Sequence, residues 1–212
     1  MDYLDILNSS YFKETYEKIE QMKKDFPVNH GFVHINNVIN NAIRIADVLC
    51  LDNQEKKMLL IACALHDIGY LEGKDDHALN GSILARKFLE DNSFSEFEID
   101  IICSAIKSHG GKNISDYNNR ISMCLIIADK LDFVSSRYNQ NILDDNKSKI
   151  FPHIFDTYVT NGVDVILYIV VDNFFDCQLF EESSYFRKLN EFMTLLSLKF
   201  GKKYKIEYVD KK

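Results

Sequence analysis

Three apolar segments of the sequence each end in a histidine or an aspartate. The segment "MLLIACALHD" ends in His66 and Asp67, "IDIICSAIKSH" ends in His109, and "ISMCLIIAD" ends in Asp129. Their apolar residues predict burial, and burying an unpaired charge costs several kcal/mol, so such groups usually form ion pairs or bind a metal. Because three segments share this feature, we expect these side chains to lie close to one another.

Two further histidines lie on helical patterns that predict an inward direction. His34 is approximately in line with Val38, and His77 has the same relation to Leu84 and Phe88, as residues on one face of a helix do. A single histidine of this kind is more often a core or capping residue than a metal ligand. Two of them, beside three polar helix ends, favour a metal site.

The order His34, His66-Asp67, Asp129 resembles the H…HD…D signature of the HD-domain metal-dependent phosphohydrolase superfamily. The local contexts are similar too: "HINNVINNAIRIA" resembles the helix of the first histidine, "LLIACALHDIGY" the HD helix, and "CLIIADKLD" the helix of the last aspartate. Together they cover roughly residues 30 to 137. The resemblance implies a mainly α fold, an HD-domain helical bundle.

The resemblance also implies a dinuclear metal site, because two more histidines fall where that branch of the superfamily supplies ligands to a second metal. One metal would be held by His34, His66, Asp67 and Asp129, and Asp67 would bridge to a second metal held by His77 and His109. The stretch "HGFVH" leaves a choice at the first position. We interpret His30 as a structural residue or one that supports a ligand, because Val38 aligns better behind His34.

Imidazole and carboxylate ligands suit one or two divalent transition metal ions. We expect Fe or Mn, and Zn, Co or Ni also fit, whereas Mg and Ca prefer sites made of oxygen atoms. Two such ions lower the pKa of a bridging water and prepare it to attack phosphorus. The expected activity is hydrolysis of a nucleotide or another small phosphoester, with Asp67 as the catalytic residue that orients the attacking water.

Substrate contacts are expected from Lys130, Tyr70 and Lys107, with Lys112 and Arg137 at the rim. Relatives that degrade cyclic dinucleotides carry a lysine after HDIG, at the position of Tyr70, so this activity is disfavoured. Two other functions stay open. One is a diiron oxygenase of the same superfamily, which carries the same ligand pattern, and the other is a non-catalytic module that senses a ligand.

The elements that must position these residues follow from hydrophobic periodicity. Helices are predicted over residues 9–25, 34–50, 54–68, 77–91, 96–108 and 119–136, and we interpret residues 1–149 as an HD-type helical metal-binding domain. After Pro152 the β-branched segments around Asn161-Gly162 predict a hairpin. Residues 150–212 are therefore expected to form a small α+β extension, whose strands could pack on the helices or mediate homodimer formation.

Composition excludes several classes of partner. The 212 residues carry a net charge of −7, so the chain has no basic surface for duplex nucleic acid. Its apolar runs are too short to span a membrane and its start does not resemble a leader, so we expect a cytoplasmic protein. The five cysteines include no CxxC pair, which favours reduced core thiols. An anionic substrate would need a local positive charge.

Overall fold

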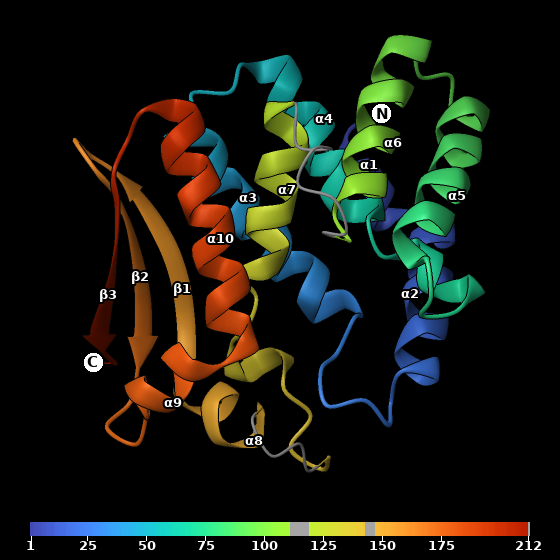
Figure 1. Ribbon diagram of the computed structural model, residues 1–212. Coiled ribbons are helices and arrows are strands. Elements are labelled where there is room, and N and C mark those ends of the chain that lie inside the picture. The colour runs from blue at the N-terminus through green and yellow to red at the C-terminus, as the bar shows by residue number, and fades with distance from the viewer. Residues whose placement is uncertain (111–118, 143–146, 212) are drawn as a thin grey trace.

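The structure, a computed structural model, describes residues 1–110, 119–142 and 147–211. A helical body is followed by a small sheet with its own helices (Figure 1), which confirms the predicted fold class. The first part contains α1 (Tyr3–Asn8), α2 (Ser10–Met22), α3 (Phe32–Val48), α4 (Asn53–Leu65), the 3₁₀-helix η1 (Ile68–Glu72), α5 (His77–Asp91), α6 (Glu96–Ser108), α7 (Arg120–Lys130) and η3 (Ser135–Arg137). The second part contains α8 (Lys147–Ile150), η4 (Phe151–His153), β1 (Ile154–Asn161), β2 (Val165–Val171), α9 (Cys177–Glu182), α10 (Ser184–Phe200) and β3 (Tyr204–Asp210).

Capping residues set where two of the helices that carry the site begin. Asp52 precedes α4 and accepts a hydrogen bond from the backbone N–H of Glu55, whose side chain accepts one from the backbone N–H of Asp52. Ser95 and Glu98 form the same reciprocal pair at the start of α6. Such pairs satisfy backbone donors that have no partner within the helix. They fix the first turn of each helix.

Three helices are shorter in the structure than the sequence predicts. The segment 9–25 is helical as far as Met22, and the segment 119–136 as far as Lys130. The segment 54–68 ends at Leu65, because His66 caps α4 and Asp67 leaves the helical path with φ −99° and ψ 2°. The chain then turns through η1, so Asp67 lies at a bend between two helical segments.

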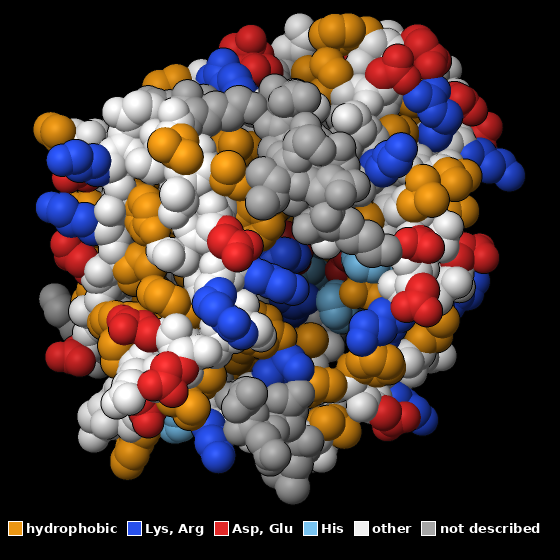
Figure 2. All heavy atoms as spheres, viewed as in Figure 1, with side chains coloured by type: hydrophobic (Ala, Val, Ile, Leu, Met, Phe, Trp, Pro, Cys, Tyr) orange, Lys and Arg blue, Asp and Glu red, His pale blue; other side chains and the backbone are white. Residues whose placement is uncertain are grey.

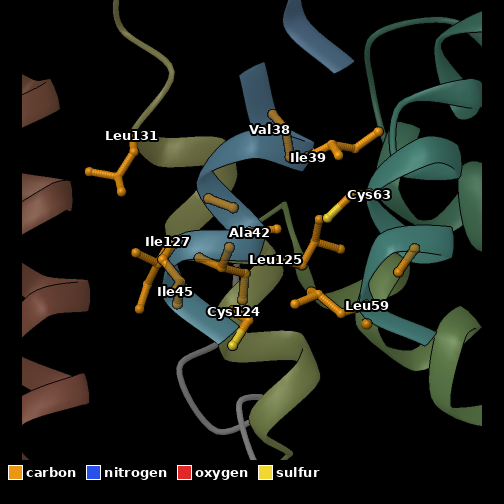
Figure 3. Close-up of a cluster of buried hydrophobic side chains, with 14 of the residues drawn as sticks. Val38, Ile39, Ala42, Ile45, Leu59, Cys63, Cys124, Leu125, Ile127 and Leu131 are labelled. Atoms are coloured by element: carbon orange, nitrogen blue, oxygen red, sulfur yellow. The ribbon is translucent and has the colours of Figure 1, made fainter. Parts of the chain in front are cut away.

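The core joins α3, α4 and α7. Figure 3 shows their apolar side chains pointing toward one another, with Ala42 and Ile45 from α3, Leu59 and Cys63 from α4, and Leu125 from α7. Each of these five side chains is at most 1% exposed. Close packing of this kind holds the three helices in fixed positions, and it therefore fixes the helix ends at which the polar residues lie.

The C-terminal part forms a three-stranded sheet in the order β1-β2-β3. The predicted hairpin is confirmed, since β1 pairs with β2 in antiparallel register, and β3 pairs with β2 in parallel. The sheet is joined to the helices through β1, where the Thr157 hydroxyl donates to the backbone carbonyl of Leu131 at 2.8 Å. Helix α10 lies beside the sheet and also contacts α7 (Figure 1). The division into domains 1–149 and 150–212, and homodimer formation through the strands, stay predictions.

All five cysteines are free, and the three in the apolar helices are buried: Cys63, Cys103 and Cys124. Burial raises the pKa of each of these thiols, which keeps them in the protonated, unreactive form. This agrees with the interpretation of these three as core thiols. Among the described residues, no helix has both the length and the apolar character that crossing a bilayer requires.

Candidate metal centre

Helix ends bring all six predicted metal ligands to one region. His34 lies in the first turn of α3, His66 caps α4, Asp67 precedes η1, His77 begins α5, His109 caps α6, and Asp129 lies in the last turn of α7. Five of these residues are buried, and His77 is half-buried. Because the helices converge there, side chains up to 95 positions apart in sequence become neighbours.

The first cluster surrounds the Nε2 atom of His34. This atom lies 3.2 Å from Nε2 of His66, 3.3 Å from Oδ2 of Asp67 and 3.4 Å from Oδ1 of Asp129. Nε2 of His66 lies 3.4 Å from Oδ1 of Asp67 and 4.0 Å from Oδ1 of Asp129. Two imidazoles and two carboxylates therefore present their donor atoms to a common space.

The second cluster lies on the other side of Asp67. Nε2 of His109 is 3.2 Å from Nε2 of His77 and 3.4 Å from Oδ1 of Asp67. The two oxygens of Asp67 thus face different histidines, Oδ2 toward His34 and Oδ1 toward His109. This carboxylate is placed where it could join two metal positions.

Backbone carbonyls fix the orientation of three of these imidazoles through the ring nitrogen that faces away from the clusters. The Nδ1 contacts are His66 with the carbonyl of Cys63 at 2.9 Å, His77 with that of Lys74 at 3.1 Å, and His109 with that of Ile106 at 2.6 Å. A carbonyl oxygen can only accept a hydrogen bond, so Nδ1 carries the proton and a neutral ring presents a lone pair at Nε2. That is the state in which imidazole binds a metal.

A seventh residue, Asp132, fixes the orientation of the His34 ring. Its Oδ2 lies 2.6 Å from Nδ1 of His34, and the side chain is 1% exposed. The side-chain amide of Asn37 donates to the other carboxylate oxygen at 2.8 Å. Sequence reasoning missed Asp132, although it lies three positions after Asp129 in the quoted segment "CLIIADKLD". A carboxylate behind a metal-ligating histidine fixes the ring and raises its basicity as a ligand.

The chemistry of these donors fits a metal ion. In the metal-free protein, the Nε2 atoms of His34 and His66, 3.2 Å apart, can hydrogen-bond to one another only when one of the two rings carries an added proton, and a metal ion would take the place of that proton. Burial lowers the pKa of His66 to about 3. Burial acts in the same direction on His34, but hydrogen bonds to Asp129, Asp132 and Asp67 outweigh it and raise its pKa to about 10. A cation between these atoms would satisfy the imidazoles and the carboxylates together.

His30 also reaches this centre. Its Nδ1 lies 2.8 Å from Oδ2 of Asp67, and its ring centroid lies 4.5 Å from that of Tyr70. The guanidinium of Arg137 lies 3.4 Å from the same Nδ1. Donor atoms of His30, His34 and Asp67 lie close enough to share an ion. The expectation that His30 supports a ligand rather than holds a metal stays a prediction.

The centre opens into a cavity of about 580 Å³. Figure 2 shows histidine side chains inside a hollow that has Lys and Arg side chains around it. Among the described residues, the cations that line this cavity are Lys23, Lys74, Lys130, Arg137, Lys147 and Lys188. A protein with a net charge of −7 therefore concentrates positive charge at the entrance to the metal centre, where it would attract an anion.

The residues expected to bind substrate have different positions. Lys130 lines the cavity and contacts Oδ2 of Asp129 at 2.5 Å. Tyr70 lines it too, but its side chain is largely buried and its ring stacks on His77 with centroids 4.4 Å apart, so it forms a wall. Lys107 is exposed and is not among the described residues that line the cavity. Lys112 lies outside the described residues.

One family of known proteins matches the part of the chain that carries the six expected ligands. A crystal structure of a predicted HD superfamily hydrolase from an uncultured Thermotogales bacterium resembles the chain with a TM-score of 0.49 and 23% sequence identity, over 68% of this chain and 80% of that one. No curated protein sequence matches the chain. The family model of the HD domain matches residues 31–134, which include the helices from α3 to α7 and all six expected metal ligands. Residues 31–134 are therefore an HD domain.

Proposed function

We propose that this protein is a metal-dependent phosphohydrolase that cleaves a nucleotide or another small phosphoester. One observation carries the proposal: a single cavity combines the histidine and aspartate clusters with a lining of six described cations. Phosphate esters are anionic, and both the metal ligands and the cations are suited to them. The HD domain that the chain contains supports the same chemistry.

The ligand set that we propose has two parts that share Asp67. His34, His66, Asp67 and Asp129 would hold one divalent metal ion, and Asp67, His77 and His109 would hold a second. Imidazole with carboxylate favours Fe or Mn, and Zn, Co and Ni also fit. When bound, such an ion supplies Lewis acidity, which lowers the pKa of water and offsets negative charge on a phosphoryl group.

The side chains of this protein have separate tasks in the proposed reaction. Asp67 faces both clusters, so its carboxylate is placed to accept a hydrogen bond from the attacking water and to orient it. Lys130 and Arg137 line the same cavity and can donate to phosphate oxygens. Arg137 is held in place by its bonds to the backbone carbonyls of Asn29 and Asp132, at 3.0 and 2.8 Å.

The aromatic wall of the cavity limits the access of water. Tyr70 stacks on His77, and the ammonium group of Lys23 lies 4.3 Å from the ring centroids of both Tyr70 and Phe26. Excluding water strengthens the electrostatic contacts within a site. These aromatic rings also supply apolar surface for the organic part of a phosphoester.

A panel of phosphoesters assayed with Mn or Fe tests the proposal. We expect release of phosphate from at least one nucleotide or sugar phosphate, and we expect His66→Ala and Asp67→Ala to abolish it. His153→Ala is the matched control, because His153 pairs with Asp172 outside the cavity and its loss should leave the activity unchanged. Silence of the metal-loaded wild-type protein across the panel would contradict the proposal and favour a ligand-sensing module, and oxygen consumption by an iron-loaded form would favour an oxygenase.

A further inference from the structure

Strand β3 forms an open edge of the C-terminal sheet. It pairs with β2 in the sheet order β1-β2-β3, and in Figure 1 no helix or strand lies beyond it. Its side chains alternate between two faces. Tyr204 and Tyr208 hydrogen-bond through their hydroxyl groups to side chains of α10 and α9, and Lys205 and Glu207 are exposed on the other face. The helices therefore hold β3 from one face and β2 holds it along one edge, and no described strand pairs with its second edge.

The backbone groups of every second residue of β3 face away from β2. The backbone carbonyl of Lys203 accepts from β2 at 2.8 Å, and the backbone N–H of Lys211 donates to β2 at 2.7 Å. Because the direction of these groups alternates along a strand, the outward N–H and C=O groups belong to Tyr204, Ile206 and Tyr208. No described residue forms a backbone hydrogen bond with them. An open row of such groups is a template for another strand.

The opposite edge of the sheet is covered. The Arg44 side chain donates to the backbone carbonyl of Thr157 in β1 at 3.1 Å, and the backbone N–H of Thr157 donates to the Asp156 carboxylate at 2.8 Å. Helix α3 also packs along β1. Pairing through β3 would therefore join two copies in a closed, symmetric contact, because neither copy offers a second open edge in the described part of the sheet.

The side chains of β3 are self-complementary in one antiparallel register. Two copies related by a two-fold axis through Ile206 place Lys205 of one copy opposite Glu207 of the other, at two symmetric positions, and Tyr204 opposite Tyr208. The backbone groups that meet in this register are the outward ones, as an antiparallel ladder requires. Opposite charges directly across two strands stabilise the pairing, and like charges destabilise it.

The neighbouring registers bring like charges together. An axis through Lys205 or Glu207 places that residue opposite itself, and an axis through Tyr208 places Lys205 opposite Lys211. An axis between two residues would bring outward backbone groups opposite groups that already face β2. Of these registers, the one through Ile206 alone pairs opposite charges without a like-charge pair.

Lys205 retains the capacity to meet a second carboxylate. Its ammonium group lies 3.6 Å from Asp164, and its side chain is 62% exposed. An ammonium group carries three donors, so the contact with Asp164 leaves donors for Glu207 of another copy. Glu207 is exposed and has no ion pair within the described part of the chain.

We infer that two copies of this chain associate by antiparallel pairing of β3 with itself, in the register centred on Ile206, so that their sheets become continuous. The occupant of the open edge is thus a second copy of the same strand. The inference is independent of the proposed function, since it uses no residue of the metal centre or its cavity.

Sedimentation equilibrium of the full chain and of charge-reversed variants tests the inference. The wild type should show the mass of a dimer that dissociates on dilution. Lys205→Glu and Glu207→Lys each turn both attractive pairs into repulsive ones, so each should raise the Kd of the dimer about tenfold or more. The double variant K205E/E207K exchanges the charges and should restore the dimer. Asp164→Asn is the matched control, because it removes only the partner of Lys205 within the chain.

A second variant tests the backbone pairing. Ile206→Pro removes an outward N–H that β2 does not use, a position at which an edge strand tolerates proline, so it should be monomeric with the circular dichroism of the wild type. Ile206→Val keeps the N–H and should dimerise as the wild type does. If Ile206→Pro does not fold, the charge-reversed variants decide alone.

Three results would overturn the inference. One is a wild type that stays monomeric at all concentrations, and another is a double variant K205E/E207K that dimerises no better than the single ones. The third is a folded Ile206→Pro that still dimerises while Tyr168→Lys does not. Tyr168 is half-buried in β2, on the same face as Glu207, so that result would mean that the copies associate through the face of the sheet instead of its edge.

Discussion

Nδ1 of His34 lies 2.6 Å from Oδ2 of Asp132, although 98 positions separate the two residues in the sequence. Both side chains are buried, and Asn37 and Arg137 also contact the carboxylate. This arrangement aims Nε2 of His34 at the first cluster. Asp132 therefore belongs to the machinery of the candidate metal centre without facing the metal position itself.

Replacing Asp132 should weaken metal binding without removing a ligand. Asp132→Ala frees the His34 ring and removes the negative charge behind it, so we expect about a 10- to 100-fold loss of metal affinity, measured by competition with a chelator of known affinity. Asp172→Ala is the matched control, because Asp172 also pairs with a histidine, His153, at a distance from the cavity. Equal affinities of the wild type and Asp132→Ala would contradict the role of Asp132.

The two clusters should lose metal separately. His77→Ala removes a donor of the second cluster only, so we expect the metal content to fall by about one ion per chain while the first position stays filled. Asp129→Ala should empty the first position instead. Elemental analysis of protein purified without chelators measures both. An unchanged metal content in His77→Ala would mean that the second cluster does not bind metal, and His153→Ala controls for the loss of any histidine.

Local patterns predicted much of the fold and the convergence of the candidate ligands. The helices over 77–91 and 96–108 have the predicted bounds, because apolar spacing determines them and, for 96–108, Ser95 caps the first turn. The convergence of His66, Asp67 and Asp129 could be expected for a similar reason, since each follows an apolar segment that must be buried.

Contacts between distant segments could not be predicted in this way. Asp132 follows the predicted ligand Asp129, but only the packing of α3 beside α7 brings it behind His34. Tyr185 and Lys188 lie on the amphipathic helix α10 and line the cavity. The pattern of α10 predicts that one face is buried, but it does not predict which surface that face packs against. Lys107 was expected to contact the substrate because it lies close to the helix end at His109. In the structure, its side chain is exposed to solvent instead.

The lysines next to two metal ligands should differ in their effect on activity. Lys130 lines the cavity and Lys107 does not, so Lys130→Ala should raise KM about tenfold or more by removing charge-assisted hydrogen bonds to the phosphate. Lys107→Ala should leave KM and kcat unchanged. Steady-state kinetics with the best phosphoester of the panel measures both variants. Equal effects of the two substitutions would show that Lys130 does not contact the substrate.

Gly69 should tolerate no side chain. A Cβ atom at this position would lie 1.9 Å from the backbone carbonyl oxygen of His77 and 2.3 Å from the backbone nitrogen of Gly81. Because backbone atoms cannot move aside as a flexible side chain can, Gly69→Ala should cost about 1 to 3 kcal/mol or more of unfolding free energy and displace His77. Gly162→Ala, where the nearest atom is at 3.5 Å, is the control. Urea denaturation and metal content measure the two effects, and wild-type values for Gly69→Ala would contradict the close approach.

The metal-free protein should be most stable near pH 6.5, the ordinary pKa of the histidines concerned. Burial lowers the pKa of His66 to about 3 and that of His30 to about 4, from 6.5. Below pH 6.5 the unfolded chain binds protons at these residues and the folded chain does not, so stability falls as the pH decreases from 6.5 toward 4. His34, with its pKa raised to about 10, contributes stability below 6.5 that is lost as the pH rises through 10.

Thermal unfolding of chelator-treated protein across this pH range tests the prediction. We expect Tm to decrease on both sides of the optimum, and we expect His66→Gln to have a shallower decrease on the acid side, because glutamine does not titrate. His153→Ala should keep the acid slope of the wild type, since His153 lies outside the cavity and pairs with Asp172. If His66→Gln keeps that slope as well, the burial of a neutral His66 does not control the acid stability of the metal-free protein.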